Sequence, residues 1–337
     1  MIHRVVISRT DAIGDVVLTL PLALLLKQRF PGVQVSFLGR SYTSAVITAC
    51  SAIDSFINRD ELIGLAENQQ QEMLSGFDAI IHVFPDKAIA GIAKRSGIPV
   101  RIGTSHRFHH WFTCNRLVSV GRKRSPLHEA QLNTCLLKPL GFTDVPDLGQ
   151  LRSLTLLDRP AALAEPYSGL IDSDRRTVIL HPTSKGSARE WGLDNFNDLI
   201  SQLSSASYQI FISGSGDDEP VLQPLLSRWG SRVTSLVGKL SLEQFIAFIS
   251  RSDALVAAST GPLHIAAALG RVAVGLYAPM RPIHPGRWEP VGARARALVI
   301  DKDCQSCRHG GSCACIQAIS PSLVVESLEQ LIAQVKA

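Results

Sequence analysis

The chain has 337 residues, of which 45% are hydrophobic and 19% charged, and its formal net charge is +5. This composition excludes an intrinsically disordered protein, and the length allows two domains of ordinary size. No apolar run reaches the roughly 18 to 20 residues that span a bilayer, and residues 1–8 read as a strand and not as a signal peptide. We therefore expect a cytoplasmic protein whose mild positive charge is compatible with an anionic ligand or surface.

The first half of the chain alternates strand and helix patterns, which is the order of a parallel sheet with crossover helices. Residues 104–126 break the pattern, because they are basic, interleaved with aromatic residues and without periodicity. We interpret them as a loop or short irregular elements. The apolar patterns predict strands at 2–8, 33–38, 55–57, 79–84 and 100–102, and helices at 15–30, 41–50, 61–74, 88–96 and 128–140.

A proline-containing segment at 143–176 marks a linker or an edge strand between two domains. The alternation then resumes and indicates a second doubly wound parallel sheet. We expect domains at 1–150 and 177–320, a linker at 151–176, and a helix at 321–337 that packs back toward the first domain. The second half is predicted to form strands at 178–181, 208–213, 233–236, 253–258 and 272–277, and helices at 195–204, 242–250 and 322–335, with others that end at Trp229 and begin at Gly261.

Four strand-to-helix turns carry polar residues at the edge of the sheet where such folds bind ligands. The first turn holds Asp11, Gly14 and Asp15. Asp15 is either the N-cap of the following helix or a general base that takes a proton from an acceptor hydroxyl.

The second turn, residues 181–191, offers the hydroxyls of Thr183 and Ser184 and the cations Lys185 and Arg189. These groups suit phosphate oxygens, although a solvated loop has the same composition. The turn is neither a Walker A loop nor a G-x-G-x-x-G fingerprint. The third turn, residues 214–219, ends on Glu219, an acidic residue of the kind that binds ribose hydroxyls in dinucleotide sites.

The fourth turn opens a helix after an apolar strand. Ser259 and Thr260 are expected to cap the helix, and Gly261 permits close approach of a ligand. Pro262 falls in the first turn, and His264 lies one turn inside. The free N–H groups and the positive end of the helix dipole make this either an anion site or an ordinary strand-to-helix junction.

Three of these turns resemble the motifs of the heptosyltransferase family, glycosyltransferase family 9, in the family's order. They are residues 11–15 followed by Leu20-Pro21, residues 181–183 running to Arg189 and Trp191, and residues 259–270. The resemblance implies an α/β fold of the GT-B type, with two facing Rossmann-like domains that carry parallel sheets. It implies an inverting glycosyltransferase that needs neither metal nor cofactor and moves heptose from ADP-L-glycero-β-D-manno-heptose to the inner core of bacterial lipopolysaccharide.

By position, the resemblance implies that Asp15 is the catalytic base and that Arg189 neutralises the leaving diphosphate. The family usually has lysine at the second position, and Lys185 competes for that role. Ser259 stands where some relatives have an aspartate that contacts the sugar. The residues implied to bind the donor are Thr183, Ser184, Lys185, Glu219, Ser259, Thr260, Gly261, Pro262 and His264.

Two alternatives to this function stay open. One is transfer from another nucleotide sugar to a bacterial surface glycan. The other is a non-catalytic nucleotide-binding protein on the same scaffold.

The basic loop is predicted to meet an anionic lipopolysaccharide-core acceptor, although a solvated basic face explains the same charges. Phe108, Trp111 and Phe112 either reach a membrane surface, giving peripheral contact with the cytoplasmic face of the inner membrane, or pack against the core. No nucleic-acid motif accompanies the loop, so nucleic acid is not expected as a partner. The predicted acceptor-binding residues are Arg101, Arg107, Arg116, Arg122, Lys123 and Arg124.

Four late cysteines, Cys304, Cys307, Cys313 and Cys315, form a C-x2-C-x5-C-x-C pattern. The spacing leaves a metal or iron–sulfur site, a disulfide and simple thiols as alternatives. Residues 301–303 spell Asp-Lys-Asp but follow the predicted sheet, so no metal is expected at the donor site.

Overall fold

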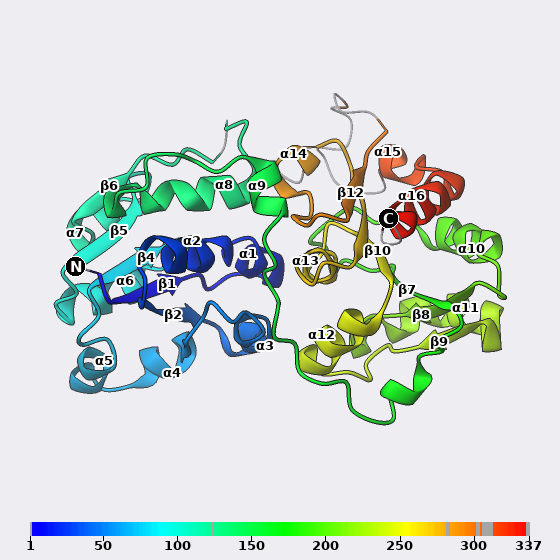
Figure 1. Ribbon diagram of the computed structural model, residues 1–337, viewed down its shortest axis with the longest axis horizontal. Coiled ribbons are helices and arrows are strands. Elements are labelled where there is room, and N and C mark those ends of the chain that lie inside the picture. Colours follow the sequence, from blue (N-terminus) through cyan, green and yellow to red (C-terminus); the bar gives the residue numbers. More distant parts are fainter. Residues whose placement is uncertain (1, 123–124, 281–283, 301–303, 305–312, 335–337) are drawn as a thin grey trace. The chain divides into compact units, whose positions relative to one another are not determined.

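A computed structural model describes residues 2–122, 125–280, 284–300, 304 and 313–334 of the chain (Figure 1). The chain divides into two compact units, residues 1–159 and 160–337. Each unit is built on its own six-stranded sheet. The division falls inside the segment whose prolines mark a change in composition.

The first sheet is wholly parallel and has the strand order β3-β2-β1-β4-β5-β6. Strand β1 lies between β2 and β4, with Ile7 paired to both Phe37 and Ile81. The order reverses between β1 and β4, which makes their carboxyl ends the switch point where doubly wound sheets bind ligands. The strands are β1 (Arg4–Ser8), β2 (Gln34–Gly39), β3 (Ser55–Asn58), β4 (Ala79–His82), β5 (Val100–Thr104) and β6 (Arg116–Val118).

The single helix predicted at 15–30 is wrong, because Pro21 divides it into α1 (Ile13–Val17) and α2 (Pro21–Arg29). Proline has no N–H to donate and its ring crowds the preceding turn. The backbone tightens around it, with Leu22 N–H bonded to the Thr19 carbonyl at 3.1 Å. The other helices of the first unit are η1 (Ser41–Thr43), α3 (Ser44–Thr48), α4 (Arg59–Gly64), α5 (Glu67–Met73), α6 (Lys87–Arg95), α7 (His110–Thr113), α8 (Glu129–Thr134), η2 (Cys135–Leu140) and α9 (Leu148–Arg152).

The second sheet repeats the topology of the first, with the order β12-β11-β10-β7-β8-β9. Its switch point lies between β7 and β10, where His181 is paired with Ala257. The fully buried Trp191 and Phe196 pack edge to face in the core beside β7. The strands are β7 (Arg176–His181), β8 (Tyr208–Ile212), β9 (Val233–Ser235), β10 (Ala254–Ala258), β11 (Val272–Leu276) and β12 (Ala295–Leu298).

The last helix, α16 (Pro321–Ala333), packs against α10 (Leu193–Gln202) and β11, with Val324, Leu328 and Leu331 in the core of the second unit. Among the described residues, no helix is both long enough and apolar enough to cross a bilayer. The remaining helices of the second unit are η3 (Ser168–Leu170), η4 (Gly216–Asp218), α11 (Glu219–Trp229), η5 (Gly230–Arg232), α12 (Leu242–Arg251), α13 (Gly261–Ala268), α14 (Pro285–Trp288) and α15 (Ala314–Gln317).

The outer strand on one side of each sheet, β6 in the first and β12 in the second, is absent from the predicted elements. Strand β6 and helix α7 occupy the stretch interpreted as irregular. Each of these strands has a single neighbour and carries an arginine, Arg116 or Arg296, so neither has the continuous apolar run of a central strand.

Candidate functional site

Arg9 follows β1 directly and forms the centre of a charged cluster at the switch point of the first sheet. Its side chain is 4% exposed. Its Nε donates to Asp11 Oδ1 at 2.6 Å, and its Nη2 donates to Oδ1 of Asp15. The carboxylate of Asp15 remains 19% exposed. A buried cation therefore holds a carboxylate that still reaches the surface of the unit.

Helix α8 supplies the other side of this cluster. Arg9 Nη1 donates to Glu129 Oε1 at 3.3 Å and to Asn133 Oδ1 at 3.4 Å. Glu129 is 1% exposed and also accepts from Arg122 Nε at 2.9 Å. The amide of Asn133 donates to the carbonyl of Leu18 at 3.0 Å. These contacts tie α8 to the segment that follows Asp15, and two guanidinium groups compensate the buried charge of Glu129.

The pKa of Asp15 is set by opposing effects. Burial is the largest of them and raises the pKa, the Arg9 cation acts to lower it, and Asp11 and Glu129 act to raise it, so that the pKa rises from 3.8 to about 6 overall. For Arg9, burial acts to lower the pKa, but the three carboxylates around it raise the pKa overall, so it stays cationic. A carboxyl that titrates near neutral pH suits a general base, because it accepts a proton readily and is still ionised at pH 7.

The structure decides against the N-cap interpretation of Asp15. The N-cap residue of α1 is Ala12, and Asp15 is the third residue of the helix. Sequence reasoning missed Arg9 and Glu129. The one signal for Arg9 was an arginine at the end of an apolar strand, and Glu129 looked like an ordinary acidic residue in the first turn of a helix.

The predicted acceptor-binding cations occupy different environments. Arg101, in strand β5, donates to the carbonyls of Thr113 and Ile98, at 2.7 and 2.5 Å, and so joins the end of α7 to the segment that precedes its own strand. Arg122 belongs to the Arg9 cluster through Glu129. The side chains of Arg107 and Arg116 are exposed, and Lys123 and Arg124 lie outside the described residues.

At the second sheet, strands β10, β7 and β8 are neighbours, so the loops that follow them meet at one edge. The loop that follows β7 holds Thr183 and Ser184, both nearly buried. Ser184 N–H donates to Glu190 Oε1 at 2.7 Å, and its hydroxyl donates to the Ala188 carbonyl at 2.9 Å. Lys185 adopts a left-handed backbone with φ of 48°. The loop therefore has a defined internal structure in which Glu190, which sequence reasoning missed, is a central acceptor.

An ion pair joins this loop to the one that follows β8. Lys185 Nζ lies 2.8 Å from Asp217 Oδ2, with the two side chains 54% and 88% exposed. Asp218 accepts from the N–H and hydroxyl of Ser215 at 2.7 and 2.6 Å. Glu219 is exposed in the first turn of α11, as a ribose ligand must be.

The helix α13 starts as expected, but its predicted side-chain cap is wrong. Thr260 is the N-cap residue and makes no side-chain cap, because its hydroxyl instead donates to the Ala258 carbonyl at 3.3 Å. The N–H groups of the first turn thus receive no oxygen from Thr260, and an anion would satisfy them. Pro262 falls in this turn, and His264 is buried one turn inside.

The described part of the cysteine cluster packs against the core of the second unit. Cys313 is buried in that core, with Cys304 and Cys315 packed against it. Cys307 and residues 301–303 lie outside the described residues.

Two doubly wound parallel sheets in one chain, each with polar residues at its switch point, are the architecture of the GT-B class of glycosyltransferases. The family model of glycosyltransferase family 9 (heptosyltransferase) matches residues 70–315. The chain belongs to this family.

Relatives and solved structures agree with that assignment. A putative glycosyltransferase of Haemophilus influenzae is 24% identical over 92% of this chain and 90% of its own length. Lipopolysaccharide heptosyltransferase 2 of Escherichia coli K12 is 28% identical over half of each chain. The structure of the E. coli ADP-heptose LPS heptosyltransferase II aligns over the full length of both chains, with a TM-score of 0.76 and 20% identity. The E. coli heptosyltransferase WaaC, solved with ADP, aligns over 97% of this chain and 99% of its own, with a TM-score of 0.74 and 18% identity.

Proposed function

We propose that this glycosyltransferase moves heptose from ADP-L-glycero-β-D-manno-heptose to the inner core of lipopolysaccharide, with inversion and without a metal. Family membership supports heptosyl transfer, and several relatives are lipopolysaccharide heptosyltransferases. We assign the acceptor to residues 1–150 and the donor to residues 177–320. Residues 151–176 then act as the linker between them.

The carboxylate of Asp15 is the observation that carries the proposal. It lies at the switch point of the first sheet, is partly exposed, and has its pKa raised by burial to about 6. As an acceptor hydroxyl attacks the anomeric carbon of the donor, Asp15 takes the hydroxyl proton. The new glycosidic C–O bond forms on the face opposite the diphosphate while the bond to the diphosphate breaks, so one displacement inverts the anomeric centre.

Negative charge gathers on the departing diphosphate and needs fixed positive partners. We assign this role to the first-turn N–H groups of α13 at Gly261 and to Arg189. Lys185 is the weaker choice, because its side chain is more than half exposed and its ammonium group is already paired with Asp217.

The other predicted donor residues surround the same edge. We assign Thr183 and Ser184, nearly buried after β7, to the phosphates, and the exposed Glu219 to the ribose hydroxyls. Ser259, Thr260, Pro262 and His264 complete the set at the start of α13.

The test is a transfer assay with the full chain, ADP-heptose and a heptose-free lipopolysaccharide core at pH 8. We expect Asp15→Asn to lower kcat by about 10²- to 10⁴-fold. Asp11→Asn is the matched control, since Asp11 shares the Arg9 partner and the same loop, and it should retain most of the activity. Full activity of Asp15→Asn would rule out Asp15 as the general base. Transfer from a UDP- or GDP-sugar but not from ADP-heptose would rule out ADP-heptose as the donor.

A further inference from the structure

Three large aromatic side chains stand out of the first unit within five residues of one another. Phe108 is 80% exposed, and Trp111 and Phe112 are each 61% exposed. Single exposed hydrophobic residues are ordinary, whereas a contiguous apolar patch on a folded surface indicates a binding surface. We call these three residues the aromatic surface.

Hydrogen bonds to backbone carbonyls and a ring contact fix the position of the aromatic surface. Trp111 Nε1 donates to the Ser105 carbonyl at 2.9 Å. The rings of Phe108 and Phe112 meet edge to face, with centroids 5.0 Å apart. Between them in the sequence, His110 is fully buried and its Nδ1 lies 3.1 Å from the Thr104 carbonyl. The buried histidine anchors α7 and the segment that leads into it, and the side chains of Phe108, Trp111 and Phe112 are exposed on this anchored segment.

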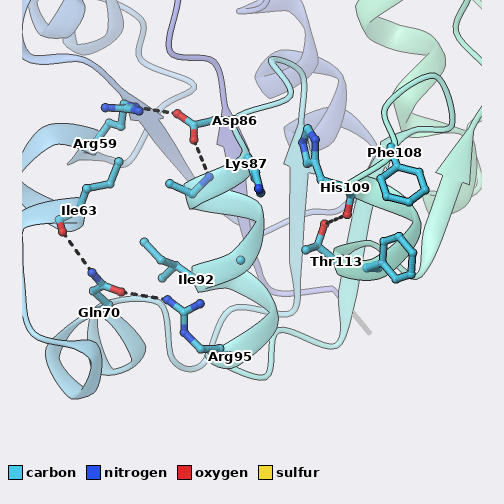
Figure 2. A pocket seen from close by; sticks show the side chains of 13 residues that line it. Arg59, Ile63, Gln70, Asp86, Lys87, Ile92, Arg95, Phe108, His109 and Thr113 are labelled. Atoms are coloured by element: carbon cyan, nitrogen blue, oxygen red, sulfur yellow. Dashed lines mark hydrogen bonds and ion pairs between the residues drawn. The ribbon is translucent and has the colours of Figure 1, made fainter.

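A groove of about 1040 Å³ borders the aromatic surface along helix α6 (Figure 2). Phe108 and Phe112 line it on the α7 side, and the small residues Ala88 and Gly91 of α6 also line it. Lys87 lies at the first turn of α6 and Arg95 at its last. The groove is thus apolar along its length, with a cation at each end of the helix.

The charge around the aromatic surface is predominantly positive. Lys87, which lines the groove, and Arg107, which precedes Phe108, are exposed. The one carboxylate that lines the groove, Asp86, is buried, paired with Arg59 at 2.6 Å, and caps α6. Arg95 pairs with Glu67, but both side chains are substantially exposed, so solvent weakens that pair.

We propose that the aromatic surface and the cations beside it dock the first unit on an anionic lipid bilayer. Tryptophan and phenylalanine insert at the boundary between headgroups and acyl chains, while lysine and arginine meet lipid phosphates. Exposed lysine and arginine beside protruding aromatic side chains match the order of an anionic bilayer, in which headgroup phosphates lie directly above the apolar acyl chains. The inference rests on the proposed function insofar as a lipopolysaccharide acceptor is itself anchored in a membrane.

Flotation of the full chain with vesicles tests the proposal, using phosphatidylcholine vesicles with and without phosphatidylglycerol. We expect binding that requires phosphatidylglycerol and weakens as salt rises, because the Debye length shrinks from about 10 Å at 0.1 M to about 3 Å at 1 M. The variant Phe108→Ser/Trp111→Ser/Phe112→Ser should bind at least tenfold more weakly. Val221→Ser is the matched control, since Val221 is 53% exposed in the second unit.

Two further readouts separate this proposal from the proposed function. The triple variant should keep its melting temperature and its transfer rate on an acceptor stripped of its acyl chains, while losing rate on an acceptor embedded in vesicles. Equal vesicle binding by the parent and the triple variant would overturn the docking surface. So would a concentration-dependent dimer that the triple variant abolishes while the parent ignores vesicles, because the partner would then be a second copy of the chain. A chain that docks on vesicles but transfers nothing would contradict the proposed function alone.

Discussion

Arg9 donates through its Nη2 to the carboxylate of Asp15, so a permanent cation lies against a carboxyl that burial would otherwise keep neutral. Burial favours the neutral acid at Asp15, whereas the guanidinium favours the carboxylate. The balance leaves the carboxyl with a pKa of about 6, so Asp15 is ionised at pH 7 and yet basic enough to take a proton. Arg9 is therefore a positioning residue that sets both the direction and the protonation of the proposed base.

Replacing Arg9 should move the acid limb of the rate profile to higher pH. Removing the cation raises the pKa of Asp15, so a higher pH is needed to ionise it. We expect Arg9→Met to shift the acid limb upward by about 1 pH unit or more, and Arg9→Lys to shift it less because the charge remains. The measurement is kcat/KM for transfer from pH 5 to pH 9.

Glu129→Gln is the control, because it should shift the acid limb of the pH–rate profile in the opposite direction. Glu129 acts to raise the pKa of Asp15, so its neutralisation should move the acid limb downward. A purely structural role for the cluster predicts lower rates in both variants with no movement of the limb. Shifts of the same sign in Arg9→Met and Glu129→Gln would therefore contradict the electrostatic account.

Arg189 and Lys185 should differ sharply in their contribution to catalysis. If Arg189 faces the developing charge on the diphosphate, Arg189→Ala loses about 10²- to 10³-fold in kcat, the loss typical of one transition-state donor. Lys185→Ala should cost only a few-fold, because an exposed ion pair is worth about 0–1 kcal/mol. Asp217→Asn frees the ammonium of Lys185 and serves as the comparison. A larger loss from Lys185→Ala than from Arg189→Ala would exchange the two roles.

His82 should make the first unit sensitive to acid. It is fully buried at the end of β4, and among the described residues neither ring nitrogen has a hydrogen-bond partner. Burial lowers its pKa from 6.5 to about 3, and the neighbouring His110 acts in the same direction. Between pH 6.5 and pH 3 the unfolded chain binds a proton that the folded chain refuses, so stability falls as pH falls.

His82→Phe removes this dependence. In the parent chain, acidification lowers the free energy of unfolding through His82 by as much as about 1.4 kcal/mol per pH unit. We expect His82→Phe to lack this contribution when both proteins are measured by urea denaturation from pH 7 to pH 4.5. His106→Asn is the control, because His106 is exposed. Identical acid sensitivity in His82→Phe and the parent chain would show that other groups drive acid unfolding.

Gly275 should tolerate no side chain. A Cβ there would lie 2.6 Å from the ring of Tyr277 and 2.8 Å from the Leu263 side chain on α13. We expect Gly275→Ala to lower the free energy of unfolding by about 1–3 kcal/mol, as overpacking does, and to weaken nucleotide binding through the displaced helix. Gly64→Ala, where a Cβ meets nothing within 4 Å, is the control. Equal stability of the two variants would show that α13 has room to shift.

The central strands of both sheets are predictable because apolar runs mark them, and the outer strands are not. Strand β1 is buried along Val5–Ile7 and reads as continuous apolar sequence. Strands β6 and β12 are short, and each depends on its pairing with one neighbour more than on its own residues. The break at Pro21 was visible in the sequence, but the apolar pattern on both sides concealed it.

The candidate site likewise contains residues that the sequence predicts and residues that it does not. Asp15 is recognisable because it stands beside Gly14 a few residues after an apolar strand, which is local sequence information. The contact between Arg9 and Glu129 joins residues 120 positions apart, and no spacing rule links them. The residue type of Thr260 predicts a helix cap, whereas its hydroxyl donates to the Ala258 carbonyl.

The most direct test of the account is the pH profile of kcat/KM for transfer from ADP-heptose to a lipopolysaccharide core, measured on the parent chain and on Asp15→Asn. The account predicts a parent profile that rises with unit slope to a plateau, with an apparent pKa of about 6, and residual activity in Asp15→Asn that lacks this limb. A parent profile that is flat from pH 5 to pH 8, or a limb that survives in Asp15→Asn, would contradict the assignment of Asp15 as the base.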